Sequence, residues 1–219
     1  MKVVPMIFNT NMVKALMAGD KVVTRRPAKN LSFSERAGFI VGEWAYGIGW
    51  NLRETMNNCI RSKSAKCPAQ RGDLIYVRET FRLFNHSDEC GCSDYCSCPP
   101  SGTPVYFANC GGDSESKWKP SIHMPRAASR LTLKVTDVRV ERVQDITEEQ
   151  AIKEGINKHH QLPAFKSPIG YHTSPVYAFE ELWNSIYGNW EENPYVWVIE
   201  FEVIHQNVDK YLESVKERP

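Results

Sequence analysis

The spacing of apolar residues changes several times along the chain, and each stretch predicts one element of regular structure. Residues 11–18 carry an apolar stripe at the helical period, with polar residues before them that can cap a helix and Gly19 after them that ends it. Residues 148–154 predict a two-turn helix, and a third helix is predicted near residues 176–187.

Three stretches carry the pattern of strands. Residues 74–81 follow a Gly-Asp turn signal, residues 131–143 form the longest strand pattern, and residues 195–204 alternate strongly, so that every second side chain shares one face. The apolar alternation of the longest strand shifts between Val135 and Val138, which indicates a β-bulge.

Few helices and several long strands favour an α+β fold around a mixed or barrel-like sheet. Residues 31–70 are irregular and predict a long loop with a short helix. Residues 84–117 predict an irregular cysteine-rich insertion with a short strand near residues 105–108. We interpret residues 1–205 as a single domain and residues 206–219 as a polar C-terminal tail that frays.

The composition of the 219 residues is that of an ordinary globular protein, with 42% hydrophobic and 24% charged residues. No apolar run approaches 18 residues, so neither a membrane-spanning helix nor a membrane partner is predicted. The first ten residues lack the long apolar stretch of a signal peptide, and we therefore expect a cytoplasmic protein.

The formal net charge of +1 hides an asymmetry between the two halves of the chain. Residues 21–82 contain 12 lysines and arginines against 5 acidic residues, whereas residues 141–202 contain 4 against 11. One interpretation is that the basic half contacts the phosphates of a nucleotide or nucleic acid. The other is that the two halves neutralise each other across the fold.

The seven cysteines do not indicate a disulfide framework, because no secretion signal accompanies them. Four of them have the spacing C-x-C-x₃-C-x-C and can supply four thiolates to a structural zinc: Cys90, Cys92, Cys96 and Cys98. This spacing is tighter than the usual C-x₂-C pairs, and four other residues are alternative ligands: Cys59, Cys67, Cys110 and His86. Reduced thiols without metal are the other interpretation. A catalytic zinc is not predicted, since no His/Glu set accompanies the cluster.

The densest chemistry lies in the stretch GDKVVTRR, residues 19–26. An amine and a hydroxyl this close can share a proton, and the neighbouring arginines can hold an anion. The stretch matches the GxKxxTxR signature of ASCH domains, which are relatives of the PUA RNA-binding fold. RGDLIYVRETF resembles the Gly-Asp turn and following strand of that family, and YVWVIEFEVI resembles its closing strand.

Two further segments extend the resemblance to most of the chain. LTLKVTDVRVERVQDITEEQAIKEGI resembles the family's central strand and short helix, and WKPSIHMPRAASR resembles a segment of the larger, prophage-type members. Residues 84–117, and much of 27–70 and 157–175, lie outside the small ASCH core. The resemblance implies a PUA-like mixed β-barrel with flanking short helices, long loop insertions and a cleft open to solvent.

Some small bacterial ASCH proteins are amidohydrolases that deacetylate N4-acetylcytidine with a lysine, a threonine and a glutamate. The resemblance places the lysine at Lys21, the threonine at Thr24 and the glutamate at Glu154, and it implies no cofactor for the reaction. In that chemistry Lys21 is a base or electrostatic stabiliser, Thr24 or water is the nucleophile, and Glu154 protonates the leaving amine.

Glu154 is unusual for its position alone. Thr147 and Gln150 fit a capping box and Gly155 fits a C-terminal stop, so Glu154 falls in the last turn of the predicted helix. There the helix dipole disfavours a carboxylate by roughly 0.3–1 kcal/mol and favours its protonated form. A solvated surface glutamate is the alternative interpretation.

The spacing of Lys21 and Thr24 poses a geometric condition. Residues three apart on a flat strand point to opposite faces, so their convergence requires a turn or bulge. We therefore predict that this segment is not a regular strand; a regular strand would exclude the catalytic interpretation.

Seven residues are candidates for contacts with a nucleoside or RNA: Arg25, Arg26, Arg78, Glu79, Trp118, His123 and Arg126. Arg25 and Arg26 bind a phosphate or orient the site, or else they form structural ion pairs with the acidic half. Glu79 shares a strand face with apolar residues, so it is either paired with an arginine or lines a cavity. The aromatic and basic side chains near His123 can stack on or hydrogen-bond a base, although a lone histidine is more often structural.

Three functions remain open from the sequence. The first is an amidohydrolase that acts on an N-acylated nucleoside, and the second is an RNA- or nucleotide-binding ASCH module without turnover. The third is a phage-associated interaction protein whose loops bind a partner.

Overall fold

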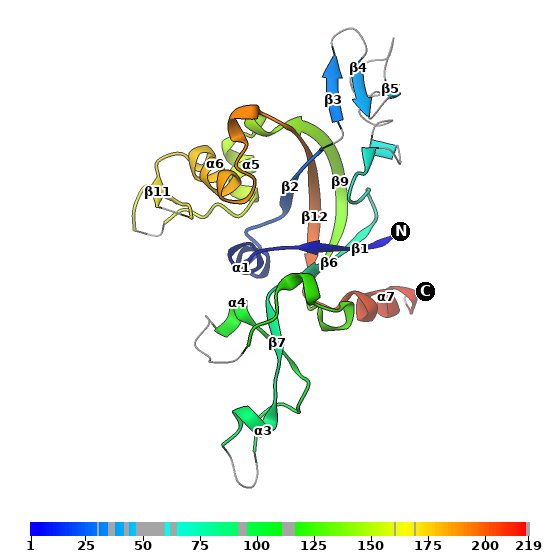
Figure 1. Cartoon of the computed structure of the whole chain (residues 1–219), viewed down its shortest axis with the longest axis vertical. Helices are drawn as coiled ribbons and strands as arrows, with labels where there is room; N and C mark the ends of the chain where they lie inside the picture. Colours follow the sequence, from blue (N-terminus) through cyan, green and yellow to red (C-terminus); the bar gives the residue numbers. More distant parts are fainter. Residues whose placement is uncertain are drawn as a thin grey trace.

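A five-stranded mixed sheet forms the centre of the molecule (Figure 1). The computed structural model describes residues 1–29, 31–34, 38–41, 44–46, 60–61, 65–91, 96–110, 117–159, 161–168 and 170–217. The strands follow one another across the sheet in the order β1 (Val3–Ile7), β6 (Leu74–Arg78), β9 (Thr132–Arg142), β12 (Tyr195–Ile204) and β2 (Val23–Pro27). β1 runs parallel to β6, and the other neighbouring strands are antiparallel. The α+β class and the mixed sheet are therefore as predicted.

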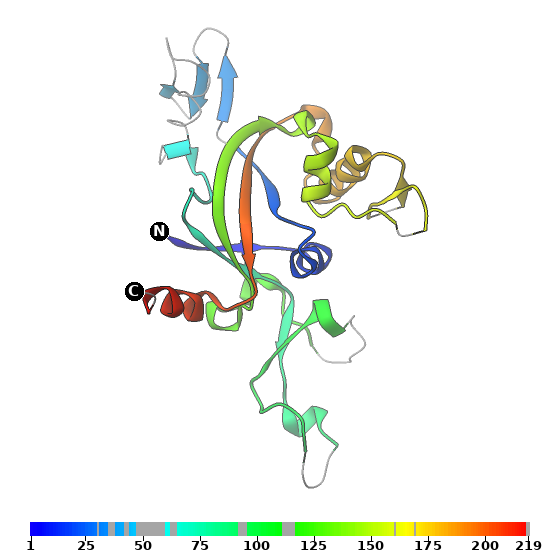
Figure 2. The ribbon, with the colours of Figure 1, turned by 180° about the vertical axis from the view of Figure 1, so that it is seen from behind.

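The sheet is strongly curved, but its described strands do not close into the barrel that the resemblance implies. β1 and β2 are the two edges, and β9 and β12 arch between them (Figure 2). Arg26 on β2 donates a hydrogen bond from Nη2 to the carbonyl oxygen of Ile7 at the end of β1, over 2.7 Å. The edges are thus linked through a side chain, in the place where a barrel would have a backbone ladder.

Both faces of the sheet are buried, and each belongs to a separate apolar cluster. Trp197, Ile199 and Phe201 of β12 point into the larger cluster, which confirms the predicted face of this strand. Val196 and Val198 point into a second cluster, beneath helices α5 (Glu148–Lys153) and α6 (Pro175–Ile186). A sheet buried on both sides holds its strands firmly, so side chains attached to it are held in place.

Two features predicted from short stretches of sequence, the first helix and the β-bulge, are present in the structure. Helix α1 (Thr10–Ala18) begins where Asn9 accepts a hydrogen bond from the Met12 amide, and it ends at Gly19 in the left-handed conformation. The register between β9 and β12 shifts between Glu200 and Phe201, opposite Asp137 and Val135, which confirms the bulge predicted in the longest strand.

The described residues between 31 and 46 form strands where the sequence predicts a loop. They contribute β3 (Leu31–Ser34), β4 (Gly38–Val41) and β5 (Trp44–Tyr46), which make a separate three-stranded sheet. Leu31 lies opposite Val41 and Phe33 opposite Phe39. The strands are short, and β3 and β4 contain serines and a glycine, residue types that are typical of loops. The alternation of apolar and polar residues that predicts a strand is therefore hard to recognise in the sequence. The short helix predicted in this stretch falls mostly outside the described residues.

The predicted insertion is a long arm that projects away from the sheet (Figures 1 and 2). The strand predicted over residues 74–81 stops at Arg78, and the chain then forms β7 (Phe81–Leu83), which pairs with β8 (Pro104–Tyr106). Helix α3 (His86–Glu89) lies at the far end of the arm. The strand predicted near residues 105–108 ends at Tyr106, because α4 (Phe107–Cys110) begins there.

Short elements complete the described part of the chain. They are the hairpin β10 (Phe165–Lys166) and β11 (Tyr171–His172) and the 3₁₀ turns Ser121–His123, Arg126–Ala128, Val143–Asp145 and Trp190–Glu192. Among the described residues, no helix has the length and apolar character needed to cross a membrane.

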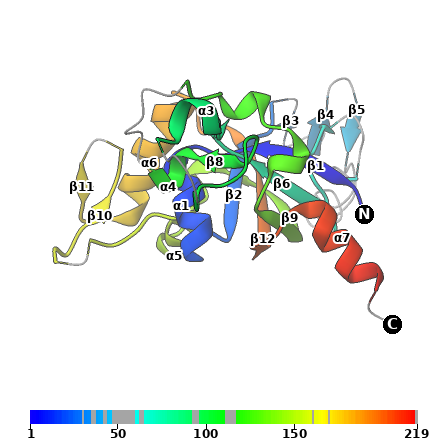
Figure 3. The same ribbon diagram turned by 90° about the horizontal axis from the view of Figure 1, so that it is seen from below.

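The C-terminal segment is a helix, not the frayed tail that its polarity suggested. Helix α7 (Val208–Lys216) lies beside the sheet, as Figure 3 shows from below. Val208 is fully buried, and Asn207 caps the helix by accepting a hydrogen bond from the Asp209 amide. The side-chain amide of Asn207 also donates to the carbonyl oxygens of Arg126 and Ser129.

We expect Asn207→Ala to lower the free energy of unfolding by about 1–3 kcal/mol. The substitution removes a helix cap and leaves carbonyl groups of the 126–129 turn without their donor. Denaturant unfolding measures the change, and Asn207→Asp separates the two roles because it keeps the cap acceptor but loses the donor. Equal stability of Asn207→Ala and the native protein would contradict this role.

Candidate functional site

Lys21 and Glu154 form a buried ion pair, although they are 133 positions apart in the chain. The Lys21 Nζ lies 2.5 Å from Oε2 of Glu154 and 2.9 Å from its backbone carbonyl oxygen. Lys21 has no exposed surface, and Glu154 is 3% exposed. The structure thus brings together two of the three residues that the ASCH resemblance singled out.

Backbone contacts place the two residues against each other. After α1 ends, the amides of Asp20 and Lys21 both donate to the carbonyl oxygen of Ala15, which bends the chain toward α5. Lys21 then forms an isolated bridge with Glu154, the C-cap of α5. Strand β2 begins only at Val23. Lys21 therefore lies before the strand, as the predicted interruption requires, whereas Thr24 lies within the regular strand.

Arg25 completes the charge balance around Glu154. Its Nη1 lies 3.2 Å from Oε1 of Glu154, and its Nη2 donates to Oε2 of Glu141 at 3.0 Å and to Oε1 of Gln150 at 2.8 Å. Glu154 therefore has a cation at each oxygen, which offsets its unfavourable place at the helix C-terminus. Gln150 also accepts from the Thr147 amide in the capping box, so one side chain both begins the helix and holds Arg25.

Burial lowers the pKa of Lys21 below the usual value for a lysine. The charge and hydrogen bond of Glu154 oppose this shift, whereas the positive charges of Arg26 and Arg25 add to it. A lysine with a lowered pKa releases its proton more readily, which is what a general base requires.

Thr24 is buried but does not join this network. It lies opposite Ile199 in the β2–β12 ladder, whereas Arg25 lies opposite Val198, so Thr24 and Arg25 point to different faces of the sheet. Ile199 belongs to the larger apolar cluster and Val198 to the cluster beneath α5 and α6. Within the described residues, the Thr24 hydroxyl makes no hydrogen bond to Lys21 or Glu154.

The remaining arginine candidates make contacts inside the protein. Arg26 donates to the Ile7 carbonyl and lies over the ring of Phe8, at 5.1 Å from its centroid. Arg78 donates to the carbonyl oxygens of Met124 and Ile122, and Arg126 pairs with Asp209. Their guanidinium groups therefore link segments of the described structure, and of these three arginines only Arg126 does so through a described ion pair.

Glu79, Trp118 and His123 have different surroundings. Glu79 is 2% exposed and forms a two-pronged ion pair with Arg130, at 2.8 and 2.9 Å, which matches the interpretation that it is paired with an arginine. Trp118 lies beneath the guanidinium of Arg82, and its buried Nε1 has no hydrogen-bond partner among the residues that the structure describes. His123 is exposed and lines a shallow hollow next to β7.

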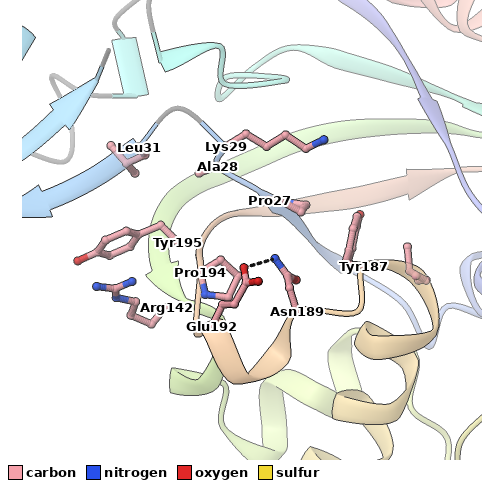
Figure 4. Close-up of a pocket in the computed structure, with 11 residues that line it drawn as sticks. Pro27, Ala28, Lys29, Leu31, Arg142, Tyr187, Asn189, Glu192, Pro194 and Tyr195 are labelled. Carbon is pink, nitrogen blue, oxygen red and sulfur yellow. Dashed lines mark hydrogen bonds between the residues drawn. The ribbon is translucent and has the colours of Figure 1, made fainter. Parts of the chain in front are cut away.

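One groove lies away from the ion pair, since neither Lys21 nor Glu154 lines it. It has a volume of about 700 Å³ and lies beyond the end of β2, among the residues that Figure 4 draws as sticks. Pro27 on its wall is six residues from Lys21, roughly 20 Å along an extended chain. A smaller pocket of about 300 Å³ lies closer, because Ala15, Asp20 and Gly155 line it and surround Lys21.

Thiol and imidazole groups gather at the end of the arm. The ligand atoms of His86, Cys90 and Cys96 lie within 4.8 Å of one another. Hydrogen bonds with the thiols of Cys96 and Cys90 raise the pKa of the neighbouring Cys98 to about 12. Three of the four predicted cysteines therefore meet, together with the histidine named as an alternative; Cys92 lies outside the described residues.

Two of the other alternative cysteines are described, and both lie outside this group of ligand atoms. Cys67 packs against the larger apolar cluster and donates to the Ala69 carbonyl at 3.0 Å, and Cys110 is exposed at the end of α4. Cys59 lies outside the described residues.

Comparisons with known proteins identify no relative of this chain. No protein-family model matches the chain. No curated protein and no solved structure matches it either. The likeness to ASCH domains therefore remains a resemblance carried by the sequence motifs.

Proposed function

We propose that this protein is an ASCH-type, PUA-like amidohydrolase that hydrolyses the amide of an N-acylated nucleoside, such as N4-acetylcytidine. The observation that carries the proposal is the buried contact of 2.5 Å between Lys21 Nζ and Glu154 Oε2. A desolvated lysine that shares a hydrogen bond with a carboxylate is a pair through which a proton can move. The sequence resemblance supplies the substrate class.

In this scheme the Thr24 hydroxyl attacks the acyl carbon while Lys21 takes up its proton. Glu154, having received a proton from Lys21, donates it to the nitrogen as the C–N bond breaks. The amine leaves, and water then hydrolyses the ester on Thr24 to release the acid. Arg25 keeps Glu154 oriented through its Nη1 contact.

Burial sets two conditions on this chemistry. Lys21 is unexposed and Thr24 is 1% exposed, so a substrate reaches them only after a covering segment moves. Thr24 points to the sheet face opposite Arg25 and makes no hydrogen bond to Lys21, so the Thr24 hydroxyl can attack only if the start of β2 shifts toward Lys21 when the substrate binds. The small pocket is lined by Ala15, Asp20 and Gly155, which neighbour Lys21, but Lys21 itself does not line it.

The proposal predicts release of cytidine from N4-acetylcytidine, with activity falling at least about 100-fold in Lys21→Arg, Thr24→Val and Glu154→Gln. Thr24→Ser is the matched control, because it keeps the hydroxyl and is expected to stay within about tenfold of the native rate. Activity is measured by chromatography of the nucleoside, and unfolding curves show that each variant is folded at the assay temperature.

Two results would contradict the proposal in different ways. Full activity of Thr24→Val with loss in the other two variants would make water the nucleophile. No turnover of acylated nucleosides by the native protein would favour the binding module without catalysis, which an RNA titration at increasing salt would then test.

We also propose that the cysteine-rich arm holds a structural zinc and that the reaction uses no cofactor. The support is the gathering of His86, Cys90 and Cys96 ligand atoms within 4.8 Å. Thiolate and imidazole are the ligands that zinc prefers in structural sites. In Figure 1, α3 at the end of the arm lies well apart from α5, whose C-cap is Glu154, so this metal is not part of the proposed reaction.

A further inference from the structure

We infer that the groove beyond the end of β2 binds a nucleotide, with the base stacked on a tyrosine ring and the phosphate held by basic side chains. Its walls come from the ends of β2 and β9, the segment after α6 and the start of β12 (Figure 4). Its volume of about 700 Å³ lies within the range of roughly 300–1,000 Å³ that is usual for small-molecule sites. Neither Lys21 nor Glu154 lines the groove, so the inference is independent of the proposed reaction.

Two tyrosine rings line the groove at positions that the surrounding structure fixes. Tyr187 is the C-cap of α6, and Tyr195 is the first residue of β12. The guanidinium of Arg142 lies over the Tyr195 ring, with Cζ at 3.8 Å from the ring centroid. The centroid of the Tyr187 ring lies 4.4 Å from that of Trp183. Rings held by such neighbours lose little freedom when a planar base stacks on them.

Two basic side chains that line the groove have no carboxylate partner in the described part of the chain. Lys29 is exposed and Arg142 is partly buried, and neither forms an ion pair with a described acidic residue. Acidic residues outnumber basic ones by 11 to 4 over residues 141–202, so this lack of a partner is unexpected for Arg142. Its Nη1 donates to the Asn193 carbonyl oxygen at 2.9 Å, which fixes the guanidinium. The fork of five N–H donors leaves others for a phosphate.

An amide and a carboxylate lie between the two tyrosines in Figure 4. Asn189 Nδ2 donates to Oε2 of Glu192 at 3.4 Å, and Asn189 Oδ1 accepts a hydrogen bond from the Trp183 indole at 3.0 Å. Together the two side chains offer donors and acceptors, as the edge of a base requires. The carboxylate disfavours a ligand that carries negative charge alone. The groove therefore suits a nucleotide better than an acidic peptide.

A free nucleotide and one unit of a single-stranded RNA present the same chemistry, and two probes distinguish them. The full-length protein is titrated at low salt with each ribonucleoside 5′-monophosphate by calorimetry, and with a fluorescein-labelled single-stranded RNA hexamer by anisotropy. We expect binding of nucleotides, with hexaglutamate at least about tenfold weaker. An RNA affinity at least about tenfold above that of every monophosphate would assign the groove to a strand, and equal affinities would assign it to a free nucleotide.

Variants of the lining residues locate the binding. Tyr187→Leu removes a ring and is expected to lower affinity at least about fivefold, whereas Tyr187→Phe keeps the ring and is expected to stay within about threefold. Lys29→Gln is expected to lower affinity at least about threefold and to reduce the slope of log affinity against log salt for the RNA by about 0.7. Lys210→Gln, which neutralises an exposed lysine on α7, is the matched control and is expected to change neither.

Three results would overturn the inference. They are no binding of any nucleotide probe by the native protein, hexaglutamate binding as tight as nucleotide binding, and nucleotide binding that Tyr187→Leu and Lys29→Gln both leave unchanged. Circular dichroism shows whether each variant is folded. Lys29 is exposed, so its variant keeps the test valid even if Tyr187→Leu is unstable. None of these results bears on hydrolysis at Lys21 and Glu154, because neither residue lines the groove.

Discussion

Glu154→Gln is expected to lower the free energy of unfolding by about 3–5 kcal/mol, because it leaves the buried Lys21 without its carboxylate. Lys21→Met is expected to cost less, since Arg25 still neutralises Glu154 from the other side. Denaturant unfolding at neutral pH measures both changes. The double variant is expected to recover part of the loss, as two groups in direct contact are not additive.

The pH dependence of Glu154→Gln gives a second test with a definite sign. Burial already lowers the pKa of Lys21, and removal of Glu154 takes away the main group that opposes the shift. When the pKa of a lysine is lower in the folded state, the unfolded state binds more protons, so stability rises with pH up to the pKa of the unfolded lysine. The difference in the free energy of unfolding between Glu154→Gln and the native protein is therefore expected to shrink between pH 7 and pH 10. A loss below about 1 kcal/mol at pH 7, unchanged with pH, would mean that the pair is not desolvated in solution.

Gly155→Ala is expected to lower the free energy of unfolding by about 2–4 kcal/mol. Its φ of +93° disfavours any residue with a Cβ. A Cβ at this position would also lie 2.8 Å from Cβ of Ala15 and 3.3 Å from Cβ of Lys21. The methyl group therefore pushes α1 away from α5 and disturbs the Lys21–Glu154 contact.

Gly19→Ala is the matched control for Gly155→Ala. Gly19 has a similar φ of +81°, but a Cβ there would meet no atom within 4 Å. Gly19→Ala is therefore expected to lower the free energy of unfolding by only about 1 kcal/mol, the cost of placing a residue with a Cβ at positive φ. Thermal or denaturant unfolding of both variants gives the difference, which measures the packing between α1 and the end of α5. Equal losses in the two variants would mean that this packing is loose.

The sequence predicted those parts of the fold that depend on neighbouring residues. The capping box of Thr147 and Gln150, the stop at Gly155 and the bulge in β9 are local signals, and the structure contains all three. The tail was mispredicted because the polarity of α7 hides a buried Val208 and the bonds of Asn207 to a distant turn.

The candidate site was predictable in its residue types but not in its contacts. The resemblance named Lys21 and Glu154, yet only folding shows that they touch. Arg25 was interpreted as a phosphate ligand or a structural partner, and its bonds to Glu141 and Gln150 depend on the curvature of β9 and on the placement of α5. Contacts between residues so far apart in the chain cannot be predicted from the spacing of residues within one segment.

The strand order has a consequence for synthesis on the ribosome. β2 pairs with β12 along one edge, and Thr24 meets Ile199 only after 175 further residues have been added. At about 5–20 residues per second, β2 waits roughly 9–35 seconds for its partner. The Lys21 segment therefore emerges from the ribosome well before the sheet beside it can form, and during that time its apolar neighbours in β2 stay unpaired with β12.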